Sequence, residues 1–142
     1  MKPGKTFADL AIGMTFSTSR KVTEQDVADF ARVSGDFNPI HMDEEYAKAS
    51  VFGTRVAHGA LTASYVSAIL GNDLPGPGAI FMDMTMSFKR PVRIGDTVVS
   101  TVEVTEMVER GYRVVLAAKC EVDGKLVMRG EAKVMVPSGK PA

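Results

Sequence analysis

The chain lacks tryptophan and has only one cysteine and two histidines among its 142 residues. A lone cysteine, Cys120, excludes an internal disulfide. The 17 basic and 17 acidic side chains cancel, so net charge does not favour nucleic acid or a membrane surface as a partner. The N-terminal residues contain no continuous apolar segment of the signal-peptide type, and we therefore expect a cytoplasmic protein.

Long hydrophobic runs are missing as well. The most apolar segment, residues 61–70, is interrupted by hydroxyl groups and is far shorter than the roughly 20 residues that cross a bilayer. The 45% apolar content and the length are ordinary for one globular domain. We expect residues 1–142 to form that domain and to end in a disordered tail at 137–142, where proline, glycine and polar residues dominate.

The first half of the chain is expected to be mainly helical. A strand over residues 14–22 precedes Thr23, a good N-cap with acidic residues in the turn that follows, and Gly35 suits the left-handed conformation that ends many helices. Small and apolar residues occupy nearly every face of residues 59–70. This second segment is therefore expected to be a helix surrounded by protein.

The stretch SGDFNPIH, residues 34–41, places a carboxylate and an imidazole just past the first helix. Pro39 fixes its own backbone angle and pushes Asn38 out of the helical region. The stretch is therefore expected to form a stiff turn that presents Asp36 and His41.

The second half of the chain is expected to be strands. Residues 81–88 alternate methionine and phenylalanine with mostly polar residues, which predicts a strand with one buried face. Three further strands, separated by turn residues, are expected to form an antiparallel meander: residues 97–107, 112–122 and 125–136. The order predicts an α+β fold, a single antiparallel sheet wrapped around a long central helix. Its unpaired edges predict association of two copies, a homodimer.

Three stretches resemble the MaoC-like, (R)-specific enoyl-CoA hydratases. FARVSGDFNPIHMDEEYA, residues 30–47, resembles their hydratase 2 motif through Gly-Asp-x-Asn-Pro-x-His, and residues 57–70 and 87–96 resemble later landmarks. The resemblance implies a hot-dog fold, a homodimer, and reversible hydration of a trans-2-enoyl-CoA to an (R)-3-hydroxyacyl-CoA. Coenzyme A then enters as the thioester substrate, and no metal or redox cofactor is implied.

The same resemblance implies roles for individual residues. Asp36 and His41 correspond to the catalytic pair, and the Gly59 backbone N–H corresponds to the donor to the thioester oxygen. Three more residues are expected in supporting roles. Asn38 is expected to be a structural turn residue, and His58 a packed or hydrogen-bonded histidine that orients the following glycine. Ser67 is expected to lie near the catalytic pair.

The chemistry fits these residue types. Adding water across a double bond conjugated to a thioester needs a base for the water, a proton for C2 and stabilisation of enolate charge. Asp36 and His41 can hold one water and return its proton to the same face, and which of them is formally the base stays open because a coupled pair titrates together. Gly59 at a helix start offers an unhindered N–H at the positive end of the helix dipole.

Other interpretations remain. A hot-dog thioesterase would direct the water to the carbonyl carbon, and a non-catalytic acyl-thioester binding module would need Gly59 but neither Asp36 nor His41. A metal site made by His41, His58 and Asp43 is not expected, because no close-spaced helical ligand pair is present. Four basic residues are candidates for attracting the phosphates of coenzyme A: Arg55, Lys89, Arg90 and Arg93.

Overall fold

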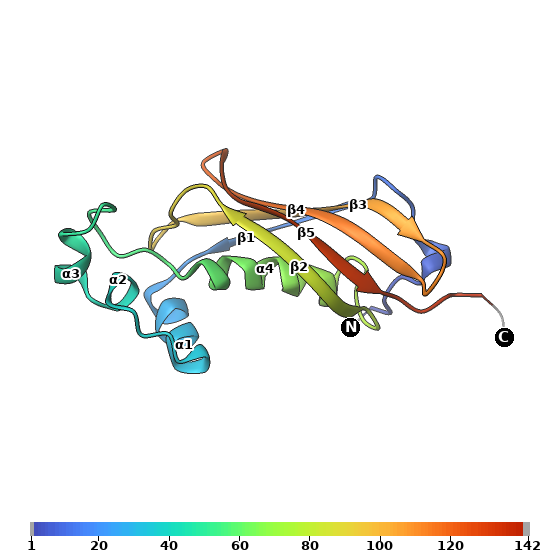
Figure 1. Ribbon diagram of the computed structural model, residues 1–142, viewed down its shortest axis with the longest axis horizontal. Helices are drawn as coiled ribbons and strands as arrows, with labels where there is room; N and C mark the ends of the chain where they lie inside the picture. The colour runs from blue at the N-terminus through green and yellow to red at the C-terminus, as the bar shows by residue number, and fades with distance from the viewer. Residues whose placement is uncertain (1, 141–142) are drawn as a thin grey trace.

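The computed structural model describes residues 2–140, and its strands form one five-stranded antiparallel sheet (Figure 1). Across the sheet the strands follow the order β1 (Thr15–Lys21), β3 (Thr97–Val108), β4 (Arg113–Val122), β5 (Lys125–Met135) and β2 (Ile80–Phe88). Strands β3, β4 and β5 form the expected meander. Strand β2 lies at the far edge beside β5 rather than beside β3, its successor along the chain.

The helices divide into one central helix and a group at one end of the molecule. Helix α4 (Gly59–Asn72) lies along one face of the sheet, and Figure 1 shows the others beyond its N-terminus. These are α1 (Glu24–Ser34), α2 (Pro39–Met42) and α3 (Glu44–Lys48), and a 3-10 turn spans Phe7–Asp9. The α+β hot-dog layout, a sheet around a long central helix, is confirmed. No helix within residues 2–140 is long and apolar enough to cross a membrane.

Local sequence explains where several elements begin and end. The Thr23 side chain accepts a hydrogen bond from the Asp26 N–H and caps α1, and Gly35 ends α1 with a φ of 82°. Asp123 and Gly124 both have positive φ, 51° and 75°, in the two-residue turn between β4 and β5. Asparagine, aspartate and glycine tolerate this conformation best, so the turn residues set the register of the hairpin.

The core lies between α4 and the face of the sheet that α4 covers. Alternate residues of the three central strands are fully buried, among them Val102, Leu116 and Val134, and they pack with Val66 and Ile69 of α4. The intervening strand residues face away from α4 and are mostly exposed. Helix α4 buries the side that faces the sheet, but Ala60, Ser64 and Ala68, which share one face, are exposed. The prediction of a helix surrounded by protein is therefore wrong for the single chain, and the helix extends two residues beyond the predicted end.

The prediction that residues 81–88 have one buried face is wrong for the single chain. Only Met84 packs against the core, and the register shifts at Met82 because a bulge interrupts the alternation. The other large apolar side chains of β2 are between 40% and 61% exposed: Ile80, Phe81, Met82, Met86 and Phe88. The physical reason is that β2 is an edge strand that α4 covers poorly.

The segment 137–142, for which disorder is predicted, makes backbone contacts in its described part, and its disorder stays a prediction. The carbonyls of Pro137 and Ser138 accept hydrogen bonds from the N–H groups of Phe7 and Ala8, at 2.8 and 3.2 Å. Residues 137–140 are therefore held against the N-terminal 3-10 turn, and residues 141–142 lie outside the described residues.

Candidate active site

A chain of local hydrogen bonds shapes the turn after α1. The Asp36 N–H donates to the Ser34 hydroxyl, the Asn38 N–H donates to Asp36 Oδ1, and the Ile40 N–H donates to Asn38 Oδ1, each at 3.1 Å. Pro39 occupies the first position of α2, where a missing N–H costs nothing. Asn38 therefore caps α2, which fits its expected structural role, and local hydrogen bonds define the conformation of the turn.

Asp36 contributes to this turn with only one of its two carboxylate oxygens. Oδ1 accepts from the Asn38 N–H, and within residues 2–140 no protein donor lies within hydrogen-bond distance of Oδ2. The side chain is exposed. A role as a turn residue is thus compatible with a second role for the free oxygen.

His41 lies in α2 with its ring held in one orientation. Its Nδ1 is 2.8 Å from the carbonyl oxygen of Val56. A carbonyl only accepts, so Nδ1 carries the hydrogen and the neutral ring keeps its lone pair on Nε2. Burial lowers the pKa of His41 below the usual 6.5; the neighbouring His58 acts in the same direction, and the Val56 carbonyl and Asp36 oppose the shift. His41 is therefore neutral at pH 7, with Nε2 able to accept a proton.

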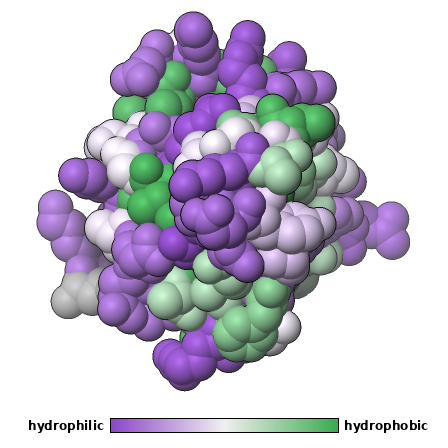
Figure 2. All heavy atoms as spheres, turned by 90° about the vertical axis from the view of Figure 1, so that its left-hand side faces the viewer, coloured by the Kyte–Doolittle hydropathy of each residue, from purple (hydrophilic) through white to green (hydrophobic). Residues whose placement is uncertain are grey.

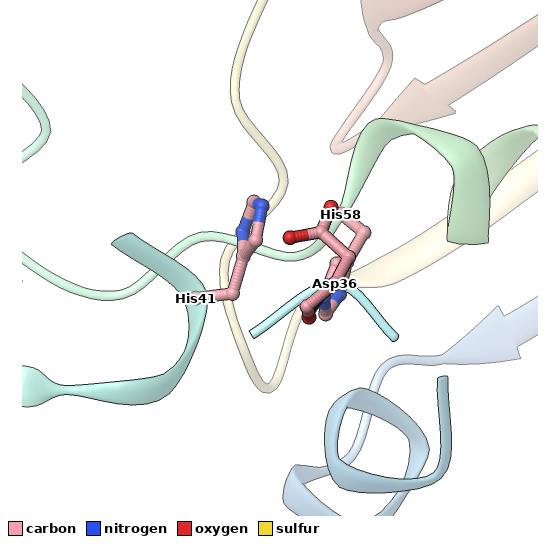
Figure 3. Close-up of side chains that lie close together, drawn as sticks. All are labelled: Asp36, His41 and His58. Carbon is pink, nitrogen blue, oxygen red and sulfur yellow. Dashed lines mark hydrogen bonds between the residues drawn. The ribbon is translucent and has the colours of Figure 1, made fainter. Parts of the chain in front are cut away.

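Three side chains converge at the start of α4 (Figure 3). A carboxylate oxygen of Asp36 and one ring nitrogen each of His41 and His58 lie within 4.8 Å of one another. Two hydrogen bonds of about 2.8 Å that meet at a water with a tetrahedral angle span about 4.5 Å. A separation between Asp36 and His41 within this limit is compatible with one bridging water.

The same three residues do not have the geometry of a metal site. The rings of His41 and His58 stack at 4.0 Å between centroids, with 30° between their planes. Imidazole lone pairs lie in the ring plane, and those of two stacked rings do not meet at a point about 2 Å from each nitrogen, as zinc requires. Asp43 is elsewhere: its side chain caps α3 through the N–H groups of Glu45 and Tyr46.

His58 is buried, with 2% of its surface exposed. Its Nε2 lies 3.0 Å from the backbone carbonyl of Asp36, and its ring also packs on Phe30, with 4.8 Å between centroids. The interpretation of His58 as a packed, hydrogen-bonded histidine fits this environment.

His41 and Gly59 line one cleft of about 410 Å³. Gly59 is the first residue of α4, so its N–H has no acceptor within the helix. A Cβ at this position would lie 2.9 Å from the ring of Phe88, which shows how closely the cleft wall approaches the glycine. The lining also includes residues that the sequence did not single out, among them Phe52, Thr62 and Phe88.

Three of the expected site residues are not in the cleft lining: Asp36, His58 and Ser67. Asp36 approaches His41 from the side, as Figure 3 shows, and its exposed carboxylate is reached from solvent. Ser67 lies two turns further along α4 and is half-buried, so a single chain does not bring it to His41 and Gly59. The supporting role of Ser67 stays a prediction.

Arg55 connects the helices of this end of the molecule. Its Nε donates to the His41 carbonyl and its Nη1 pairs with Glu24 at the start of α1, both at 2.6 Å. Only 12% of the Arg55 side chain is exposed. The guanidinium thus faces inward, in contrast to Lys89 and Arg90, which line the cleft.

A larger hollow, about 620 Å³, lies on the face of the sheet turned away from α4. It is floored by small residues such as Ala117 and Gly130 and edged by charged side chains, including the ion pair between Lys119 and Glu121. It contains no histidine and no helix start. We place the candidate site at the smaller cleft because His41 and Gly59 line it and the Asp36 carboxylate lies close to His41.

Seen from the end formed by α1, α2 and α3, the surface is largely hydrophilic with separate apolar patches (Figure 2). The exposed large apolar side chains of this part of the chain are Val33, Phe37, Tyr46 and Val51. Phe37 lies directly beside Asp36 in the sequence, so the turn that carries the acid also presents an aromatic ring to solvent.

Comparisons with known proteins find relatives that match nearly the whole chain. The chain is 48% identical over 132 residues to the (R)-specific enoyl-CoA hydratase of Rhodospirillum rubrum, covering 93% of this chain and 92% of that protein. It is 46% identical over 136 residues to the 3-hydroxybutyryl-CoA dehydratase of Methylorubrum extorquens, covering 96% and 87%. The solved structure of R-hydratase PhaJ1 from Pseudomonas aeruginosa matches with a TM-score of 0.90 at 37% identity, covering 98% and 92%. The MaoC like domain matches residues 8–125, and the chain belongs to this family.

Proposed function

We propose that this protein catalyses the reversible, (R)-specific hydration of a trans-2-enoyl-CoA to a 3-hydroxyacyl-CoA. The observation that carries the proposal is the spacing of Asp36 and His41, which is compatible with one bridging water, beside a cleft that also contains the Gly59 N–H. The names of the relatives, an enoyl-CoA hydratase and a 3-hydroxybutyryl-CoA dehydratase, support the same reaction in its two directions.

The proposed mechanism uses one water and no other reactant. The pair of Asp36 and His41 removes a proton from the water as its oxygen bonds to C3, and electron density moves through C2 to the thioester oxygen. The Gly59 N–H, at the positive end of α4, stabilises that enolate charge, and such a donor is typically worth about 10²–10³ in rate. The pair then returns the proton to C2, so the hydroxyl group and the proton add to the same face of the double bond.

The state of His41 suits this sequence. Its Nδ1–H is committed to Val56, which leaves Nε2 free to accept a proton, and its lowered pKa keeps it neutral at pH 7. Asp36 supplies a carboxylate whose second oxygen is open to water. We assign the proton transfer to the pair as a unit, because the protonation of one member changes the affinity of the other.

We propose further that the reaction needs no metal or redox cofactor. Addition of water is not a redox reaction. A backbone donor rather than a Lewis acid stabilises the enolate charge. For the coenzyme A part of the substrate, Lys89 and Arg90 at the cleft are the best placed of the four basic candidates, because the Arg55 guanidinium is already paired.

We propose a homodimer that forms through β2. Both β1 and β2 are sheet edges, but β1 is mainly polar and basic, with Arg20 and Lys21, whereas β2 exposes a row of methionine and phenylalanine side chains. Charged edges resist pairing and apolar unpaired edges favour it. Because Phe88 of β2 also touches the start of α4, the same interface would close one side of the cleft.

One experiment separates hydration from its two rivals. Purified protein is mixed with crotonyl-CoA, and the enoyl-thioester absorbance and free thiol are followed in parallel. The proposal requires loss of absorbance without thiol release, and chiral analysis of the product must give the (R) alcohol. Thiol release would instead show a thioesterase, and no change in either signal while the ligand binds would show a non-catalytic binding module.

A further inference from the structure

We infer that His58 is a positioning residue that holds the acid, the base and the backbone donor in one geometry, and that the two histidines of this chain carry opposite neutral tautomers. The inference rests on the proposed function for its kinetic part but not for its tautomers. His58 contacts each of the three residues that carry the proposed functional groups. It donates to the Asp36 carbonyl, stacks on His41 and immediately precedes Gly59.

The tautomers follow from the hydrogen-bond partners. Both ring contacts go to backbone carbonyls, which only accept, so the nitrogen facing each carbonyl carries the hydrogen. His41 is therefore protonated on Nδ1, facing Val56, and His58 on Nε2, facing Asp36. The remaining nitrogen of His41 is free for chemistry, whereas Nδ1 of His58 is buried and has no partner within residues 2–140.

That buried Nδ1 explains why His58 is not a second base. A proton added there would be a donor without an acceptor in a buried position, beside the ring of His41, and an unsatisfied buried donor is costly. The geometry thus assigns the transferred proton to His41 rather than to His58. Phe30 also packs on the His58 ring, with 53° between the ring planes, so the ring has little freedom to turn.

The hydrogen bond of His58 connects two segments that are distant in the sequence. His58 is the N-cap residue of α4, so its bond to the Asp36 carbonyl ties the turn after α1 to the helix start that carries the Gly59 N–H. Without this tie, the carboxylate and the backbone donor belong to separate segments. A displacement of about 1 Å between reacting groups can cost about 10²-fold in rate.

The tautomers can be tested directly because the chain has only two histidines. Protein labelled with ¹⁵N-histidine is recorded by NMR at neutral pH, and the resonances are assigned with His41→Gln and His58→Gln. The inference requires one ring with the Nδ1–H pattern, lost in His41→Gln, and one with the Nε2–H pattern, lost in His58→Gln. Two rings with the same tautomer, or a charged His58, would overturn it, whatever reaction the protein catalyses.

Two substitutions separate positioning from packing. His58→Phe keeps a ring to stack on His41 and Phe30 but removes the donor to Asp36, and His58→Gln keeps an N–H at a similar reach. We expect His58→Phe to lower kcat for crotonyl-CoA hydration about 10–100-fold with little change in KM. His58→Gln should recover a large part of that loss.

Melting temperatures of both variants and of the wild type accompany the kinetics. A His58→Phe protein that melts like the wild type and retains its kcat would refute positioning. Equal kcat losses in both variants would refute the donor as the cause. If neither variant folds, the NMR pattern of the wild type decides whether the two tautomers are opposite. An inactive wild type with the expected tautomers would refute the proposed function but not the tautomer assignment.

Discussion

Replacing Asp36 by asparagine and His41 by glutamine, singly and together, tests whether the two side chains act on one water. The structure indicates small effects on folding. Asp36→Asn keeps an oxygen that accepts from the Asn38 N–H, and His41→Gln loses one hydrogen bond to Val56, typically worth about 0.5–1.5 kcal/mol. In a domain of this size 1 kcal/mol shifts the melting temperature by about 2–4 °C. Both variants should therefore be well folded at assay temperature.

The expected effects on kcat are much larger. Loss of a general acid-base group lowers kcat by about 10²–10⁴, and a 10³-fold loss corresponds to about 4 kcal/mol of transition-state stabilisation. Independent groups would lose about 10⁶ together. Two groups that hold the same water cannot lose it twice, so the double variant should be close to the single variants, with a coupling energy of about 4 kcal/mol.

The assay is steady-state hydration of crotonyl-CoA followed by the loss of enoyl-thioester absorbance. Asp123→Asn is the matched control, because this remote turn aspartate has a φ of 51° that asparagine also tolerates, and its kcat should equal that of the wild type. Losses in the Asp36 and His41 variants that multiply in the double variant, together with lower melting temperatures, would mean that the turn is mainly structural.

Four further outcomes are expected. Gly59→Ala should lower kcat about tenfold or more, because the new methyl meets the Phe88 ring where the thioester would approach; crotonyl-CoA kinetics check this, and an unchanged kcat would remove Gly59 from the site. Activity that needs neutral His41 should persist as pH falls through 6.5 and decline only below it, which a profile of kcat against pH measures. Folding stability should decrease from pH 6.5 downward, because the unfolded chain takes up this proton at a higher pH than the folded chain; thermal melts at a series of pH values measure this. Met86→Lys on β2 should shift a dimer toward monomer in sedimentation whereas Ser19→Lys on β1 should not, and a wild-type monomer that is active at assay concentration would contradict the proposed dimer. EDTA should leave activity intact, and inactivation that zinc reverses would restore the metal interpretation.

Features that depend on nearby residues were predictable from the sequence. The Thr23 cap, the left-handed Gly35 and the turn at Asp123 each follow from the conformation of one or two residues. The turn that presents Asp36 and His41 is likewise local, because an asparagine cap and a proline set it. Their pattern also carries the family resemblance, and this explains why the candidate pair was found without a structure.

Features that depend on distant contacts were not predictable. The period-two pattern of β2 indicates a strand but not its neighbour, and pairing with β5 leaves it at an edge with its methionines uncovered. The bond between His58 and Asp36 joins residues 22 positions apart. Arg55 looks like any solvated arginine in the sequence, since only the folded chain shows that Glu24 and the His41 carbonyl occupy its guanidinium.

The contact between Glu24 and Arg55 has a consequence for anyone who redesigns the surface charge of this protein. Glu24 is 66% exposed and would be chosen for replacement by the same criteria as Glu45, which pairs only with Lys48 on its own helix. The two carboxylates are not equivalent. Removing Glu45 disturbs an exposed pair of the kind usually worth less than about 1 kcal/mol. Removing Glu24 frees an inward-facing arginine that bonds the backbone of His41, so a substitution at the surface reaches the candidate active site through a single side chain.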